Sequence, residues 1–245
     1  PQRTYVDTYF NEQVFPVLTP LAVDSGHPFP YISNLSINLA VEIQDKASTE
    51  PHFARVKVPK VLPRFVQIPA DLQTLSGASA DQPVHWIAVP MEQVISHNIG
   101  GLFPGMRVQN CYTFRITRNA DLAVEEDEAD DLMLAIEQEL RKRRMGGSAV
   151  RMEIESGMTA AIRSTLMNEL NIQAEDVYEI EGPMGLTDLM SLIGLPLPEL
   201  KDPQWTPVLP APWKSTLHAE GEDVFSLIRR RDRLVHQPYR SFAGT

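Results

Sequence analysis

The sequence has little cysteine: Cys111 is the single one among 245 residues. One thiol excludes an internal disulfide framework and a cysteine-rich zinc site. It also favours a reducing, cytoplasmic setting, because disulfides accumulate in oxidising compartments. No stretch reaches the roughly 18 consecutive apolar residues that a membrane-spanning helix needs, so the sequence predicts no transmembrane segment.

Positive charge is scarce as well. The chain has 22 Lys and Arg residues against 32 Asp and Glu residues, a net charge of −10. Proteins that bind long polyanions do so through surfaces rich in Lys and Arg, so the chain as a whole is a poor candidate for binding nucleic acid or anionic membranes. Positive charge is concentrated only in two short runs, Arg141–Arg144 and Arg229–Arg233.

Several catalytic signatures are missing. The sequence has no Gly-x-x-x-x-Gly-Lys-Ser/Thr phosphate loop, no Gly-x-Gly-x-x-Gly after a strand and no His-Glu-x-x-His. The histidines lie far apart, and none is spaced from another as metal ligands are: His27, His52, His85, His97, His218 and His236. We therefore assign no metal ligand and no catalytic residue from the residues alone.

What is present is the pattern of a globular protein, with 43% hydrophobic and 22% charged residues. Apolar residues alternate with polar ones over Leu35–Ile43, which predicts a strand with one buried face. Thr4–Val14 is predicted to be a short helix. Tyr112–Ile193 has the pattern strand, helix, strand, helix, strand, helix. The predicted fold class is therefore α+β, with mixed strands and helices in one large domain.

Other elements follow from the same patterns. Strands are predicted at Phe53–Val58, Arg64–Ile68, Val84–Val89, Val150–Ile154 and Val177–Ile180, and helices from Pro90, Asp127, Thr159, Thr187 and Asp223. Thr159 is expected to cap its helix, and Gly100 and Gly101 to end the helix from Pro90. The helix from Asp127 ends in Arg141–Arg144, which we interpret as charge that suits a helix C-terminus rather than as a ligand site.

Leu195–Pro212 is a proline-rich segment that we interpret as a stiff linker. Six prolines exclude regular structure there. A new helix is predicted after it, so a domain boundary is expected near Pro212.

Seven stretches carry a resemblance to a known family. They are Phe15–Asp24, His27–Val41, Lys57–Pro59 with Pro63–Val66, Gly101–Met106, Phe114–Leu122, Gly182–Met190, and Ile228–Asp232 with Val235–Phe242. They resemble the bacterial polyphosphate kinases of the first, ATP-using class, in the family's order and over essentially the whole chain.

The resemblance implies a magnesium-dependent enzyme that reversibly moves the terminal phosphate of ATP onto inorganic polyphosphate through a phosphohistidine. The family has a helical N-terminal domain, a head (middle) domain and two C-terminal domains similar to phospholipase D. By this resemblance, residues 1–17 end the N-terminal domain. Residues 18–212 form the head domain, with the linker at 195–212, and residues 213–245 begin the first catalytic domain.

The family's phosphate-accepting histidine stands in a His-x-Lys context, which this sequence does not contain. The resemblance therefore implies that this histidine, the magnesium ligands and most nucleotide contacts lie beyond Thr245. We expect the chain alone to be inactive and to bind neither ATP nor magnesium. The candidate ligand contacts are those that would enter the catalytic half, Arg229, Arg231, His236 and Tyr239; a solvated helix face is the competing interpretation.

The expected role is a structural and subunit-contact region of a homo-oligomeric kinase whose partners are its own remaining domains, ATP and polyphosphate. The alternative is a stand-alone, non-enzymatic interaction module derived from a head domain. Two further polar residues, Arg118 and Asp121, flank a predicted turn. We interpret them as a pair rather than as ligand contacts.

Overall fold

The computed structural model describes residues 1–23, 26, 28–45, 51–73, 86–119, 147–206, 208, 224–232, 234, 236 and 239. The chain divides into two compact units, Pro1–Met190 and Ser191–Thr245. The domain boundaries expected after residues 17 and 212 stay predictions. The predicted helix at 127–145, with Arg141–Arg144, lies outside the described residues, as do His27 and Asp121.

The first unit begins with helical turns that span the segment predicted as a helix. α1 (Gln2–Tyr9) continues as a π-helical turn, η1 (Phe10–Val14), and a 3-10 turn, η2 (Phe15–Val17). Val6, Phe10 and Val14 are buried. Their spacing of four places them on one face of the helix, which packs into the core.

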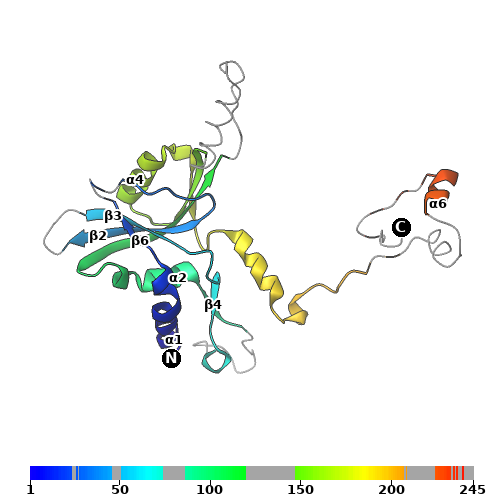
Figure 1. Ribbon diagram of the computed structural model, residues 1–245, viewed down its shortest axis with the longest axis horizontal. Coiled ribbons are helices and arrows are strands. Elements are labelled where there is room, and N and C mark those ends of the chain that lie inside the picture. The colour runs from blue at the N-terminus through cyan, green and yellow to red at the C-terminus, as the bar shows by residue number, and fades with distance from the viewer. Residues whose placement is uncertain are drawn as a thin grey trace, which may run out of the picture. The chain divides into compact units, whose positions relative to one another are not determined.

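A six-stranded sheet forms the centre of this unit (Figure 1). Its strands in spatial order are β1 (Leu21–Ala22), β3 (Pro51–Lys57), β2 (Ile37–Asp45), β6 (Met106–Arg118), β7 (Ala149–Glu155) and β8 (Val177–Ile180). Neighbours are antiparallel except β7 and β8, which are parallel. A parallel pair needs a crossover connection, and α4 (Ala160–Leu170) lies between these two strands in the chain.

The central strand β2 departs from the expectation of one buried face. All five residues of Ile37–Val41 are buried. A hydrophobic cluster covers each face of the sheet here, because Leu39 and Val41 belong to one cluster and Ala40 to the other. The polar Asn38 is tolerated inside because its amide is hydrogen-bonded.

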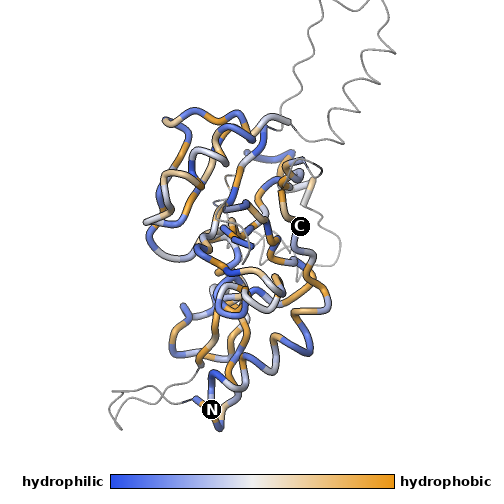
Figure 2. Tube along the Cα trace, turned by 90° about the vertical axis from the view of Figure 1, so that its left-hand side faces the viewer, coloured by the Kyte–Doolittle hydropathy of each residue, from blue (hydrophilic) through white to orange (hydrophobic). Residues whose placement is uncertain are grey.

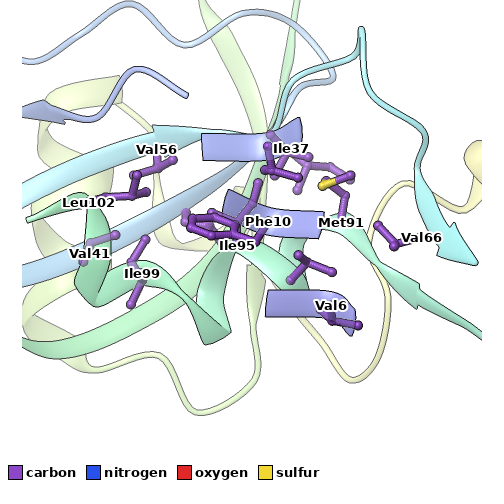
Figure 3. Packing of buried hydrophobic residues seen from close by; sticks show 14 of the residues in the cluster. Val6, Phe10, Ile37, Val41, Val56, Val66, Met91, Ile95, Ile99 and Leu102 are labelled. Carbon is purple, nitrogen blue, oxygen red and sulfur yellow. The ribbon is translucent and has the colours of Figure 1, made fainter. Parts of the chain in front are cut away.

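The first cluster joins the N-terminal helix to the sheet (Figure 3). Phe10, 2% exposed, lies among side chains of β2, β3 and α2 (Met91–His97). Its buried members also include Val6, Ile37, Val56, Val66, Met91, Ile95, Ile99 and Leu102. These apolar side chains come from segments up to about a hundred residues apart, and their burial is the main force that holds this unit together.

The second cluster covers the opposite face, where α4 packs on the sheet. Phe114 and Ile116 from β6 and Met152 and Ile154 from β7 meet Ile162 and Leu166 of α4. Ile32 completes this core from the loop before β2. The alternating apolar residues of β6 and β7 thus face α4, as their period of two predicts.

A smaller sheet pairs β4 (Phe65–Gln67) with β5 (Ala88–Pro90), and η3 (Ala70–Leu72) follows β4. The predictions of a strand at Arg64–Ile68 and a helix after Pro90 are confirmed by β4 and α2. The two glycines do not end α2, however. It ends at His97, and both glycines form part of the 3-10 turn η4 (Ile99–Leu102).

The ends of α4 show one wrong prediction. Thr159 precedes the helix but makes no capping hydrogen bond, and its hydroxyl is buried without a partner among the described residues. At the other end, Asn171 adopts a left-handed backbone with φ 51°, a conformation that Asn accepts more readily than most residues. The 3-10 turn η6 (Ala174–Asp176) then leads into β8.

Short helical turns make up the rest of the described chain. η7 (Leu186–Gly194) crosses the division between the units, and η8 (Pro198–Leu200) is a turn in the proline-rich segment. α6 (Val224–Arg230) matches the predicted helix from Asp223. No helix of the described residues is long and apolar enough to cross a membrane, and hydrophobic and hydrophilic residues alternate along the trace (Figure 2). The α+β fold class is confirmed.

Candidate functional site

The predicted ligand contacts all lie in the second unit. Arg229 is in the last turn of α6 and Arg231 follows the helix directly; both side chains are exposed. His236 and Tyr239 lie further along and are also exposed. Exposed guanidinium groups are available to phosphate oxygens, but they equally suit the C-terminal end of a helix.

The structure brings two of the four predicted residues together. The rings of His236 and Tyr239 have centroids 4.9 Å apart, with an edge-to-face angle of 60°. Trp205 also packs against Tyr239, with centroids 5.5 Å apart at 85°. The Val208 N–H donates to the Tyr239 carbonyl at 3.2 Å, which ties the proline-rich segment to this group.

Trp205 was missed by the sequence analysis. The signal available was an isolated aromatic residue within a run of prolines, where an apolar ring has no regular element to pack on. The role of the four predicted residues in ligand binding stays a prediction.

In the first unit, two of the resembling stretches meet at Arg64. Its guanidinium donates to both carboxylate oxygens of Glu92, and its Nε donates to Asp188 at 3.0 Å. It also donates to the Met184 carbonyl at 3.2 Å. Burial lowers the pKa of Arg64, and the hydrogen bond and charge of Asp188 act in the opposite direction.

The approach of residues 182–188 to Arg64 depends on Gly185. This residue has φ +68°, and an added Cβ would lie 3.3 Å from the Ile37 side chain. Glycine adopts that backbone without strain, and its missing side chain leaves Ile37 in place. The result is a junction that links β4, α2 and residues 182–188.

A second junction is formed by Arg118. Its Nε donates to the Ile32 carbonyl at 2.7 Å and its Nη1 to the Gly147 carbonyl at 2.9 Å. Its guanidinium also lies 4.4 Å from the ring centroid of Tyr31, a favourable cation–π distance. Two of the guanidinium nitrogens of Arg118 are thus hydrogen-bonded to backbone carbonyls. Its interpretation as a structural residue fits these contacts, although its expected partner Asp121 is not among the described residues.

Three cations gather at the end of β3. Arg55 is buried, with its Nε donating to Asn38 Oδ1 at 2.9 Å. Lys57 donates to Ser33 Oγ at 3.0 Å. Burial, then Arg55, then Lys60 lower the pKa of Lys57. The sequence analysis did not identify this group, although the alternation of Arg55 and Lys57 in a predicted strand places both on one face.

No three His, Cys, Asp or Glu side chains among the described residues gather as metal ligands would. His97, which ends α2, lies 3.6 Å from the Asp7 carboxylate and is about half exposed. The expectation that this chain binds no magnesium stays a prediction.

Comparison with known proteins was consistent along the chain. The sequence profile described as "Polyphosphate kinase middle domain" matches residues 1–192. Proteins named polyphosphate kinase from Aphanizomenon baltica and Synechocystis sp. are 52% and 51% identical to this chain, over 254 and 255 residues. Both alignments cover 100% of this chain, but 65% of the first relative and 35% of the second.

One solved structure has the same fold. The crystal structure of polyphosphate kinase from Porphyromonas gingivalis superposes with a TM-score of 0.70 at 22% identity. The match covers 98% of this chain and 32% of that chain. This chain thus spans about a third of the length of most of the relatives described here.

Proposed function

The chain belongs to the polyphosphate kinase family, and on that premise we propose that it is the head region, with the beginning of the next domain, of a longer enzyme. That enzyme reversibly transfers the terminal phosphate of ATP to inorganic polyphosphate. The observation that carries the proposal is the match to the family's middle domain over residues 1–192. Relatives of about 50% identity over the full chain support the activity of the whole protein.

Within that enzyme, the role of this chain is to support the catalytic domains rather than to react. The contacts of Arg64 and Arg118 favour this role, because their guanidinium donors are used to fasten distant segments. The phosphohistidine, magnesium and ATP belong to polypeptide outside this chain. The single half-buried thiol, Cys111, supports a cytoplasmic setting for the whole.

Phosphate labelling tests where the covalent step occurs. The whole enzyme is incubated with ATP labelled in its terminal phosphate, and phosphohistidine peptides are mapped at alkaline pH, where they survive. We expect label only outside these 245 residues, and no magnesium-dependent polyphosphate synthesis by this chain alone. Label on any of its six histidines contradicts the proposal.

The second part of the role is contact between subunits. Exposed apolar side chains on the first unit support it, since Leu186 and Met190 are each 64% exposed and such residues often lie in interfaces. Replacing both by Asp in the whole enzyme is expected to lower its oligomeric mass in sedimentation. Ser164→Asp with Asn168→Asp, at exposed polar positions of α4, is the matched control; equal masses for the wild type and both variants argue against this contact.

The ligand contacts proposed in the second unit are Arg229, Arg231, His236 and Tyr239. Their exposure and the packing of Tyr239 against both His236 and Trp205 support a role in holding phosphate or base. Arg229→Glu with Arg231→Glu should weaken polyphosphate binding by the whole enzyme at low salt. Arg163→Glu is the control, because Arg163 is already paired with Glu179. Unchanged binding by the double variant rejects this assignment.

A further inference from the structure

In the part of the chain that the structure describes, the cations at the end of β3 have only neutral hydrogen-bond partners. Arg55 is 6% exposed, and the partner it has among the described residues is the neutral amide oxygen of Asn38. Asn38 in turn donates to the carbonyl and hydroxyl of Ser36 at 2.8 and 3.0 Å. Lys57 donates to a neutral hydroxyl as well, that of Ser33. No carboxylate of the described residues pairs with either cation.

Two other partly buried arginines of the same unit have carboxylate partners. Arg64 faces two carboxylates, and Arg115 donates to Glu153 at 3.0 Å. The chain has ten more acidic than basic residues, so carboxylates are plentiful. Their absence around Arg55 is therefore a local feature that the general composition does not explain.

This arrangement is energetically unfavourable without a ligand. A buried charge loses hydration, and only an opposite charge or strong hydrogen bonds make up that loss. Arginine keeps its proton in proteins, so Arg55 stays charged, and Lys57 and exposed Lys60 add like charge beside it. A bound anion would relieve both the desolvation and the repulsion.

We propose that Arg55, Lys57 and Lys60 form a binding site for the oxygens of a phosphate group. Arg55 and Lys57 are two residues apart in β3 and extend from the same face of the sheet, and Lys60 follows in the next turn. Asn38 holds Nε of Arg55, which leaves the two terminal nitrogens to face a phosphate in the geometry that guanidinium prefers. Exposure rises along the site, from Arg55 at 6% to Lys60, which is exposed.

The phosphate group can come from inorganic phosphate, pyrophosphate or one unit of polyphosphate. The polyphosphate source rests on the function proposed above, whereas the other two do not. Lys57 serves as its own reporter, because a lysine of lowered pKa has more of the neutral, reactive amine. Its acetylation can be followed by mass spectrometry in the whole enzyme, without removing any other domain.

The experiment measures the acetylation of Lys57 in the presence of each anion at concentrations up to about 10 mM. At that concentration a site with a Kd of about 1 mM is mostly filled. We expect protection of Lys57 of about tenfold by at least one anion. Lys201, exposed in the second unit, is the internal control and should not change. If no anion protects Lys57, the site does not exist; protection by phosphate and pyrophosphate but not by polyphosphate supports the site and rejects the polymer.

Two variants assign the effect to Arg55. Arg55→Met removes the charge while keeping the volume, and should weaken protection by at least about tenfold. Asn38→Asp places a carboxylate against Arg55 and should raise the melting temperature while abolishing protection, since the internal anion replaces the ligand. Protection that persists in both variants overturns the proposal. Polyphosphate synthesis by the whole enzyme is measured in parallel. Synthesis without protection of Lys57 rejects the site but not the proposed function, whereas absence of synthesis contradicts the proposed function.

Discussion

Arg64 and Glu92 form a two-pronged salt bridge inside the first unit, with the carboxylate almost completely buried. The side chain of Glu92 is 7% exposed and that of Arg64 is 13% exposed. Asp188 and the Met184 carbonyl also accept from Arg64. The bridge therefore fastens three segments that are far apart in the sequence.

Arg64→Met should destabilise the chain by about 3–5 kcal/mol, because it leaves Glu92 buried without a counter-charge. The free energy of unfolding, measured in urea, gives the value. Arg163→Met is the matched control: Arg163 pairs with Glu179 at the surface, and its loss should cost less than about 1 kcal/mol.

A double variant tests whether the loss of stability comes from the unpaired charge of Glu92. Arg64→Met combined with Glu92→Met removes both buried charges and should recover much of the lost stability, since apolar replacements of a buried pair are often neutral. A double variant as unstable as Arg64→Met would mean that Asp188 and Met184 carry the stabilisation instead.

Much of the fold was predictable from periodicity. β8 coincides with the predicted strand Val177–Ile180, and β7 contains the predicted Val150–Ile154. In both strands, the local sequence pattern alone was enough to predict the strand. The pattern failed for β2, where polar Asn38 suggested a solvated face, because hydrogen bonds from Asn38 to Ser36 make its burial possible.

Phe10→Ala should cost about 3–5 kcal/mol of stability, the usual cost of removing a large buried aromatic side chain. Phe10 is 2% exposed within the first cluster, whereas its neighbour Phe15 is 46% exposed. Phe15→Ala is the control and should cost under about 1 kcal/mol. If both substitutions cost little in urea unfolding, residues 1–17 contribute little to this core, as the predicted boundary after residue 17 implies.

Gly147→Ala should destabilise the junction around Arg118 by about 1–3 kcal/mol, because the new methyl group would collide with the Asn119 carbonyl oxygen. The shift would also disturb the bond from Arg118 to the Gly147 carbonyl. At Gly101 an added methyl group meets nothing within 4 Å, so Gly101→Ala should leave the melting temperature nearly unchanged. A similar loss for both variants would contradict the collision.

The candidate sites were less predictable than the fold. Arg229 and His236 were chosen for their chemistry and their place in the family, and nothing local in the sequence says whether they approach each other. The group at Arg55 depends on Asn38 and Ser33, which lie about twenty residues away in the chain. Pairing between β2 and β3, together with the loop that precedes β2, brings them together.

Cys111 provides a test that depends on pH. Burial raises the pKa of this thiol, the hydrogen bond from Ser96 at 3.5 Å lowers it by less, and the charge of Glu155 adds to the rise. Because the thiolate is the reactive form, alkylation of the native chain at neutral pH should be much slower than alkylation of the urea-unfolded chain.

The same shift links stability to pH, with a sign that follows from proton binding. The unfolded thiol loses its proton near pH 8.5, while the folded thiol keeps it to a higher pH, so above that value the folded state holds more protons. Stability from this group is present below about pH 8.5 and is lost as pH rises toward the folded pKa, by up to about 1.4 kcal/mol per pH unit. Cys111→Ala removes the linkage, so the stability of the wild type relative to this variant should fall between about pH 8 and 9.5; a constant difference would show that the folded thiol ionises normally.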